Sequence, residues 1–298
     1  MKEVEIKKIL VPIDFSETSD RVMYEAATLA KSLKADIYLI HIIETNGLYS
    51  SFDERIKTNN PAYEDLDVAV KERMDEIRME MKKEFGINSE VFISQGEVHT
   101  EIIAYSKQEN IDLIVMGAHG VSGYKEIFIG SNAQRVVTLS DTPVLTMRKN
   151  NNKDSFENIL LPIDNSSHSR EKVNIAMVIA QLHGANIHLI GLPDSHDEVE
   201  LRELKIKLKS VEDILIEDKL PFETNIVHGD NLSEAAMKYA AKFNCDLIVI
   251  NTGHESKITG HFLGAFAQQI VNHSKVPVLS VRAKKDSVMI TAPGYGIS

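Results

Sequence analysis

The chain alternates short apolar runs with longer stretches in which apolar residues recur at helical spacing. In the first 150 residues, five runs are rich in β-branched residues and too short for helices: Ile9–Ile13, Ile37–Ile43, Val91–Ser94, Leu113–Met116 and Val144–Met147. Runs of this kind are typical of strands buried on both faces of a parallel sheet. We therefore expect five parallel strands in this part of the chain.

The segments between these runs have the period of amphipathic helices. Apolar side chains are spaced three or four residues apart in three such segments: Val22 to Leu33, Leu66 to Met81 and Leu201 to Leu215. Strands that alternate with helices predict right-handed βαβ connections and a doubly wound α/β domain. The methionines within this pattern indicate core packing rather than a cofactor site.

The second half of the chain repeats the first. Three blocks recur in the same order: Lys8–Asp14 as Asn158–Asp164, Asp112–Met116 as Asp246–Ile250, and Thr142–Arg148 as Val276–Arg282. The offset is 150 for the first block and 134 for the other two, so the second copy is 16 residues shorter. We assign much of the extra length to the polar stretch Asn46 to Asn60 and expect a loop there.

The repeat predicts two Rossmann-like doubly wound domains, each with a five-stranded parallel sheet. The predicted domains span residues 1–149 and 156–285, followed by a tail at 286–298. The polar joint at 149–157 has the composition of a linker. The last strands, Val144–Arg148 and Val278–Arg282, would be sheet edges that pair within the chain as a pseudo-dimer. We also expect two chains to associate as a homodimer.

Composition narrows the functional classes. The 298 residues carry a net charge of −11, which argues against a general nucleic-acid binder. No apolar run reaches membrane-spanning length, and the N-terminus has no secretory pattern. With the single Cys245, this predicts a cytoplasmic protein without disulfides. Eight of the eleven histidines lie in the second half, but none has zinc-ligand spacing, so we predict no metal site.

Candidate chemistry lies where two predicted strands end. Asp14 follows the first strand, and Gly117 and Gly120 follow the fourth. Gly130-Ser131 then opens a predicted helix, in which Ser131 and Gln134 have capping-box spacing. Glycines let backbone N–H groups approach a ligand, and a helix N-terminus favours phosphate. Neither a Walker A loop nor a Gly-x-Gly-x-x-Gly fingerprint occurs. A tight strand-to-helix loop without a ligand is the alternative explanation.

These residues resemble the universal stress protein family in its tandem form. The resemblance rests on Val-Pro-Ile-Asp-Phe-Ser at 11–16, His-Ile-Ile-Glu at 41–44, and Gly117-x-x-Gly120-x9-Gly130-Ser131, the family's ATP-binding signature. It implies that ATP, with Mg²⁺, binds in the first half. Asp14 and the backbone near Ile42 would hold adenine, and Pro12 and Met116 would line the pocket. The ribose and phosphates would be held by six residues: Gly117, His119, Gly120, Gly130, Ser131 and Asn132.

The second half departs from this signature. Asn251, His254, Ala265 and Phe266 stand where the first half has Gly117, Gly120, Ser131 and Asn132, whereas Asp164 and Gly264 are retained. We therefore expect the second half to bind ATP poorly or not at all.

The resulting prediction is an ATP-binding, nucleotide-responsive stress or signalling protein. No nucleophile–base set or carboxylate pair suggests an enzyme, and slow ATP hydrolysis would be a secondary property. The alternative is an interaction scaffold that does not depend on nucleotide. The loss of the ATP-binding signature from the second half supports this alternative.

Overall fold

The computed structural model describes residues 4–44, 61–118, 129–148, 155–164, 168–193, 195, 197–252, 254–256, 260–282 and 289–290. The first half contains β1 (Lys8–Pro12), α1 (Glu17–Leu33), β2 (Asp36–Glu44), α3 (Pro61–Phe85), β3 (Ser89–Gly96), α4 (Val98–Gln108), β4 (Leu113–Gly117), α5 (Ser131–Leu139) and β5 (Val144–Met147). The main elements of the second half are β6 (Asn158–Ile163), α6 (Arg170–His183), β8 (Asn186–Gly191), α7 (Glu198–Glu217), β9 (Phe222–Ile226), α8 (Leu232–Lys242), β10 (Leu247–Thr252), α9 (Ala265–His273) and β13 (Val278–Arg282).

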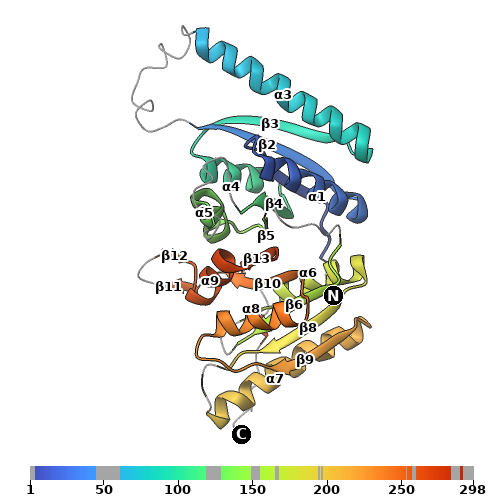
Figure 1. The fold of residues 1–298 in the computed structure, drawn as a ribbon, viewed down its shortest axis with the longest axis vertical. Helices are drawn as coiled ribbons and strands as arrows, with labels where there is room; N and C mark the ends of the chain where they lie inside the picture. The colour runs from blue at the N-terminus through green and yellow to red at the C-terminus, as the bar shows by residue number, and fades with distance from the viewer. Residues whose placement is uncertain are drawn as a thin grey trace.

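The strands form one sheet of ten, in the order β3-β2-β1-β4-β5-β13-β10-β6-β8-β9 (Figure 1). Within each half all strand pairs of this sheet are parallel. β1 lies between β2 and β4, and β6 lies between β8 and β10, so the strand order reverses at the first strand of each half. Two doubly wound units, each with a five-stranded parallel sheet, are therefore confirmed. The β3 strand is longer than predicted, because its alternating burial does not form a continuous apolar run.

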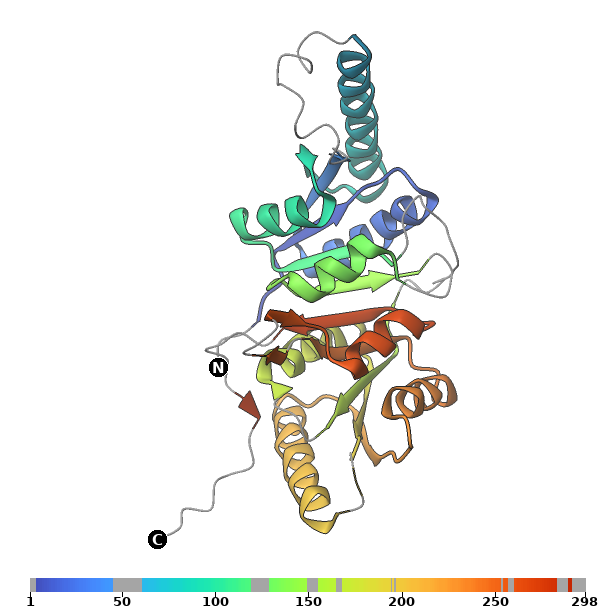
Figure 2. The ribbon, with the colours of Figure 1, turned by 90° about the vertical axis from the view of Figure 1, so that its left-hand side faces the viewer.

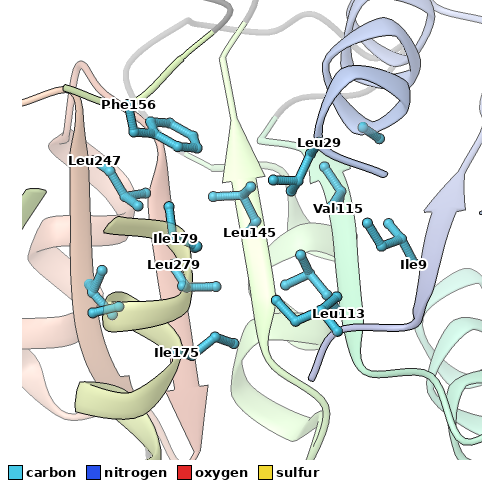
Figure 3. Close-up of a cluster of buried hydrophobic side chains, with 14 of the residues drawn as sticks. Ile9, Leu29, Leu113, Val115, Leu145, Phe156, Ile175, Ile179, Leu247 and Leu279 are labelled. Carbon is cyan, nitrogen blue, oxygen red and sulfur yellow. The ribbon is translucent and has the colours of Figure 1, made fainter. Parts of the chain in front are cut away.

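The two halves meet where β5 pairs antiparallel with β13. Leu145 lies opposite Leu279 in this register. Ile175 and Ile179 of α6 approach the same place from the side, and Phe156 lies at its end (Figure 3). Strand pairing and apolar packing thus join the halves, and the predicted pairing of the two last strands within one chain is confirmed.

Helices cover both faces of the sheet (Figure 2). On one face, α1, α3, α6 and α7 pack over a single buried apolar cluster that continues from the first half into the second. On the other face, α4, α5, α8 and α9 cover a second continuous cluster. Met74 and Met81 are fully buried in the first of these clusters, as core packing requires. Because both cores cross the junction, the halves are packed as one body.

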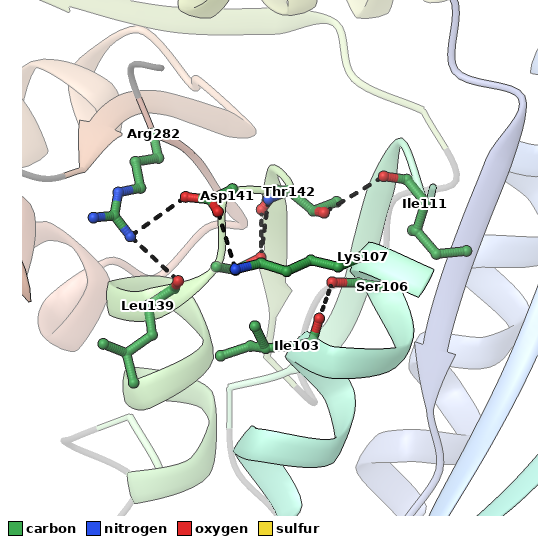
Figure 4. Close-up of polar contacts among 9 residues, drawn as sticks. Ile103, Ser106, Lys107, Ile111, Leu139, Asp141, Thr142 and Arg282 are labelled. Carbon is green, nitrogen blue, oxygen red and sulfur yellow. Dashed lines mark hydrogen bonds and ion pairs between the residues drawn. The ribbon is translucent and has the colours of Figure 1, made fainter. Parts of the chain in front are cut away.

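Two arginines at equivalent positions form hydrogen bonds across the junction. Arg282, which ends β13, donates to the Leu139 carbonyl at the end of α5 and lies 3.6 Å from the Asp141 carboxylate (Figure 4). Arg148, just after β5, donates to the Asn272 carbonyl in α9. Each side chain reaches the last turn of a helix in the other half, where carbonyl oxygens lack intrahelical partners. The two arginines therefore add polar contacts to the apolar junction.

Two short strand pairs were not predicted from the sequence. The β7 strand (His168–Ser169) pairs with β14 (Met289–Ile290), and β11 (His254–Ser256) pairs with β12 (Gly260–Phe262). The tail expected at 286–298 thus has at least two residues that dock on the second half. The loop expected at Asn46 to Asn60 lies outside the described residues. None of the helices in the described part of the chain is long and apolar enough to cross a membrane.

Candidate functional site

The sheet opens at its carboxyl edge between β1 and β4. These strands pair only at Ile9↔Leu113 and Leu10↔Ile114. By contrast, β1 continues along β2 as far as Pro12, and β4 continues along β5 as far as Gly117. Such a crevice, at the point where strand order reverses, is where open α/β sheets bind ligands. The sequence-predicted residues Pro12 and Gly117 lie at its two sides.

Asp14 lies on the β1 side of this crevice in a tightly bonded turn. Its Oδ1 accepts hydrogen bonds from the Ser16 N–H at 3.0 Å and from the Ser16 hydroxyl at 2.6 Å. Ser16 in turn caps α1 by accepting from the Ser19 N–H at 3.1 Å. The carboxylate is half-buried and is tied through Ser16 to the start of a helix. The carboxylate is thereby held in place at the carboxyl edge of the sheet.

Gly130 lies on the opposite side, at the start of α5. Its N–H donates to the Ala118 carbonyl at 2.7 Å, and the Ala118 N–H donates to the Met147 carbonyl at 2.7 Å. The beginning of α5 is thus held against the carboxyl end of β4, beside Gly117. Gly130, Ser131 and Gly117 therefore lie together, as the sequence predicts, while His119 and Gly120 fall outside the described residues.

The expected capping box at Ser131 is wrong. Gly130 is the N-cap residue, with extended backbone angles, and no side chain caps the helix there. Ser131 already belongs to the first turn, so its hydroxyl does not occupy the N-cap position, from which a side chain accepts hydrogen bonds from the N–H groups of that turn. An N-terminus without a side-chain cap offers N–H donors and the positive end of the helix dipole to an anion. The absence of a side-chain cap makes this helix end more suited to a phosphate group.

The remaining predicted residues form the apolar and exposed parts of the same edge. Ile42 and Met116 are buried, with 8% and 6% of their surface exposed. Pro12 is half-buried at the end of β1, Ser131 is exposed, and Asn132 is half-buried in the first turn of α5. This edge of the sheet thus combines apolar residues with the Asp14 carboxylate and the N-terminus of α5. Within the described residues no three His, Cys, Asp or Glu side chains gather as metal ligands.

The second half has the same opening but different chemistry. There β6 and β10 pair only at Ile159↔Leu247 and Leu160↔Ile248. The Lys172 amine, from the first turn of α6, lies inside this end of the sheet and donates to the Pro162 carbonyl at 2.7 Å. Val22 occupies the equivalent position in the first half. Phe266 is partly buried and packs against the apolar cluster beneath α9.

Comparison with known proteins agrees with this architecture. A family model described as the universal stress protein family matches residues 5–148 and again residues 155–282. The chain belongs to the universal stress protein family. Universal stress proteins of single-domain length match about half of it. One is the universal stress protein MJ0577 of Methanocaldococcus jannaschii, 32% identical over 161 residues that cover 49% of this chain and 96% of that protein.

Two further universal stress proteins extend the comparison. YxiE of Bacillus subtilis is 33% identical over 156 residues, covering 47% of this chain and 98% of YxiE. The crystal structure of a universal stress protein from Archaeoglobus fulgidus matches 95% of this chain and 99% of its own, with a TM-score of 0.74 and 21% identity. This last likeness concerns the fold, and it extends over both repeats.

One contact of this universal stress protein was not anticipated from its sequence. The ring of His41, in the second half of β2, lies with Nδ1 2.7 Å from the Ile13 carbonyl and stacks on Phe15 with ring centroids 4.4 Å apart. Both contacts are to the immediate neighbours of Asp14. The signal available in the sequence was the repeat itself, since Gly191 and Asn165 replace His41 and Phe15 in the second half.

Proposed function

We propose that this universal stress protein binds ATP in the crevice between β1 and β4 and acts as a nucleotide-responsive stress or signalling protein. The observation that supports this most is the opening of the sheet there. A carboxylate, Asp14, lies on one side and an N-terminus without a side-chain cap, at Gly130, on the other. These are complementary to the two ends of an adenine nucleotide.

Each end of the nucleotide has a matching chemistry. A carboxylate accepts hydrogen bonds, so Asp14 suits the amino group of adenine, and Ile42, Met116 and Pro12 offer apolar surface to the base. The Gly117 N–H, the N–H groups in the first turn of α5 beyond Gly130, and the Ser131 hydroxyl can donate to phosphate oxygens, whereas the Gly130 N–H is engaged by the Ala118 carbonyl. His119, Gly120 and Asn132 complete the proposed ribose and phosphate contacts, by the family resemblance.

Magnesium would arrive with the nucleotide. Mg²⁺ commonly binds through substrate phosphates, with few protein ligands. This fits a crevice without a cluster of acidic side chains among its described residues. We assign no catalytic residue, and any ATP hydrolysis would be a slow side reaction.

Titration calorimetry with Mg-ATP on the full chain tests the proposal. Two variants are a matched pair, because Asp14→Ala and Asp164→Ala remove the equivalent carboxylate from the two halves. We expect one binding site, weakened by Asp14→Ala, abolished by Gly117→Val and unchanged by Asp164→Ala. Two sites would contradict the non-binding second half. No binding up to millimolar ATP, in protein free of copurified nucleotide, would contradict the proposal itself.

A nucleotide-independent scaffold is the second candidate, and the continuous ten-stranded sheet favours it. Because β5 and β13 already pair with each other, the homodimer expected from the sequence would have to use other surfaces. Sedimentation equilibrium with and without Mg-ATP tests this. A scaffold keeps the same oligomeric state under both conditions, and a stable monomer would contradict the homodimer. The cytoplasmic location stays a prediction.

A further inference from the structure

His41 holds the turn that carries Asp14. The Ile13 N–H already bonds to the Ile40 carbonyl of β2 at 2.8 Å, and the imidazole Nδ1 of His41 lies 2.7 Å from the Ile13 carbonyl. A carbonyl oxygen can only accept, so Nδ1 must be the donor. Both backbone groups of Ile13 are therefore held by β2, one by its main chain and one by the imidazole.

The same ring supports the residue on the other side of Asp14. Phe15 has a φ of 60°, a left-handed conformation that a bulky residue adopts only when its surroundings hold it there. Its ring stacks on His41 with centroids 4.4 Å apart and planes inclined by 27°. Since Ile13 and Phe15 are both fixed to one imidazole, the backbone of Asp14 between them is held, and the two Ser16 hydrogen bonds orient the carboxylate on that backbone.

The second half excludes this arrangement. Asp164 is retained, but Gly191 takes the place of His41. A Cβ atom at Gly191 would lie 2.8 Å from Leu208 Cδ1 of α7, so a larger side chain there would require the Leu208 side chain to move. The chain thus contains two equivalent carboxylates, of which only the one in the first half is held by an imidazole.

We propose that His41 is the positioning residue that makes the first site select adenine over guanine. This inference rests on the proposed ATP binding. A fixed carboxylate accepts a hydrogen bond from the 6-amino group of adenine. Guanine has a carbonyl oxygen at that position, and two hydrogen-bond acceptors repel each other. A carboxylate free to turn away would lose this discrimination. His41 acts through Ile13 and Phe15, and Gly130 at the phosphate end is not involved.

The test compares two substitutions at one position. His41→Phe keeps a ring to stack on Phe15 and removes the donor, whereas His41→Asn places an amide donor near the position of Nδ1. For each full-length protein, calorimetry gives the affinity for Mg-ATP, Mg-GTP and Mg-tripolyphosphate. Tripolyphosphate probes the phosphate end alone. Far-ultraviolet circular dichroism and the Tm report on folding.

For His41→Phe we expect about a tenfold loss of ATP affinity, the effect of one hydrogen bond, with GTP and tripolyphosphate affinities unchanged. His41→Asn should recover most of the ATP-to-GTP ratio. An unchanged ratio in His41→Phe, or equal losses for all three ligands, would overturn the inference while leaving ATP binding intact. Wild-type protein that binds no ATP would refute the proposed function and this inference with it.

Discussion

The buried Lys172 allows a prediction whose size follows from the structure. Its side chain is among the largest that are fully buried, and only 1% of the residue is exposed. Burial lowers the pKa of the amine from 10.5 to about 7, and the Asp164 carboxylate offsets part of this. The first half has Val22 at the equivalent position, so the fold does not need a lysine here. Lys172→Met replaces the amine with an apolar chain of similar length.

The sign follows from proton binding. Because the folded pKa is lower than the unfolded one, the unfolded chain holds more protons between pH about 7 and 10.5, and the free energy of unfolding rises with pH in that window. From pH about 7 to about 9 the rise is about 2 kcal/mol. At pH about 7 the buried amine lowers the free energy of unfolding by about 4 kcal/mol. Lys172→Met should recover only about 1 to 3 kcal/mol of this, because the Pro162 carbonyl then loses its hydrogen-bond donor.

Urea unfolding, followed by circular dichroism at pH about 7 and about 9, measures this. We expect Lys172→Met to be more stable than wild type at the lower pH and to lose about 2 kcal/mol of that advantage at the higher pH. Val22→Lys is the matched control, and it should be less stable than wild type, with the opposite pH trend. An advantage of Lys172→Met that is the same at both pH values would refute the reasoning.

Three further predictions concern other parts of the fold. Burial raises the pKa of the Cys245 thiol to about 12, so we expect it to resist a thiol reagent at pH about 8 in native protein and to react fully in urea. Arg282→Ala should lower the free energy of unfolding by about 1–3 kcal/mol, because the carbonyl of Leu139 loses its donor. Asp141→Ala should cost less than about 1 kcal/mol, because that carboxylate is half exposed, and equal losses would contradict this ranking. The buried Asp246 accepts N–H bonds from the start of β6, so Asp246→Ala should cost about 2 kcal/mol by urea unfolding, and a neutral result would contradict this.

Much of the fold could be predicted from local patterns. Apolar runs such as Leu113–Met116 must be buried strands, because they are too short for helices and lack a polar face. The repeat of Lys8–Asp14 as Asn158–Asp164 showed that one fold occurs twice. Asp14, Gly117 and Gly130 could be identified as candidates because each directly follows a predicted strand or opens a predicted helix.

Other features depend on atoms far apart in the sequence. Whether Ser131 caps α5 or lies in its first turn is decided by the bond that draws Gly130 back to Ala118, which no local pattern encodes. The burial of Lys172 could likewise not be predicted from the sequence, because lysine is a charged residue that is normally exposed. It depends on the packing of α6 against the end of β6. Sequence periodicity describes which face of an element is apolar, not which single atoms meet across it.

What the sequence alone determined is the alternation of strands and helices, their duplication and the residues at the strand ends, since these follow from spacing along one chain. Only the tertiary structure decided that β5 and β13 join ten strands into one sheet. It also decided that the sheet opens between β1 and β4 and that His41 reaches Ile13. These are contacts between distant segments, and their geometry exists only when both segments are packed against the same core.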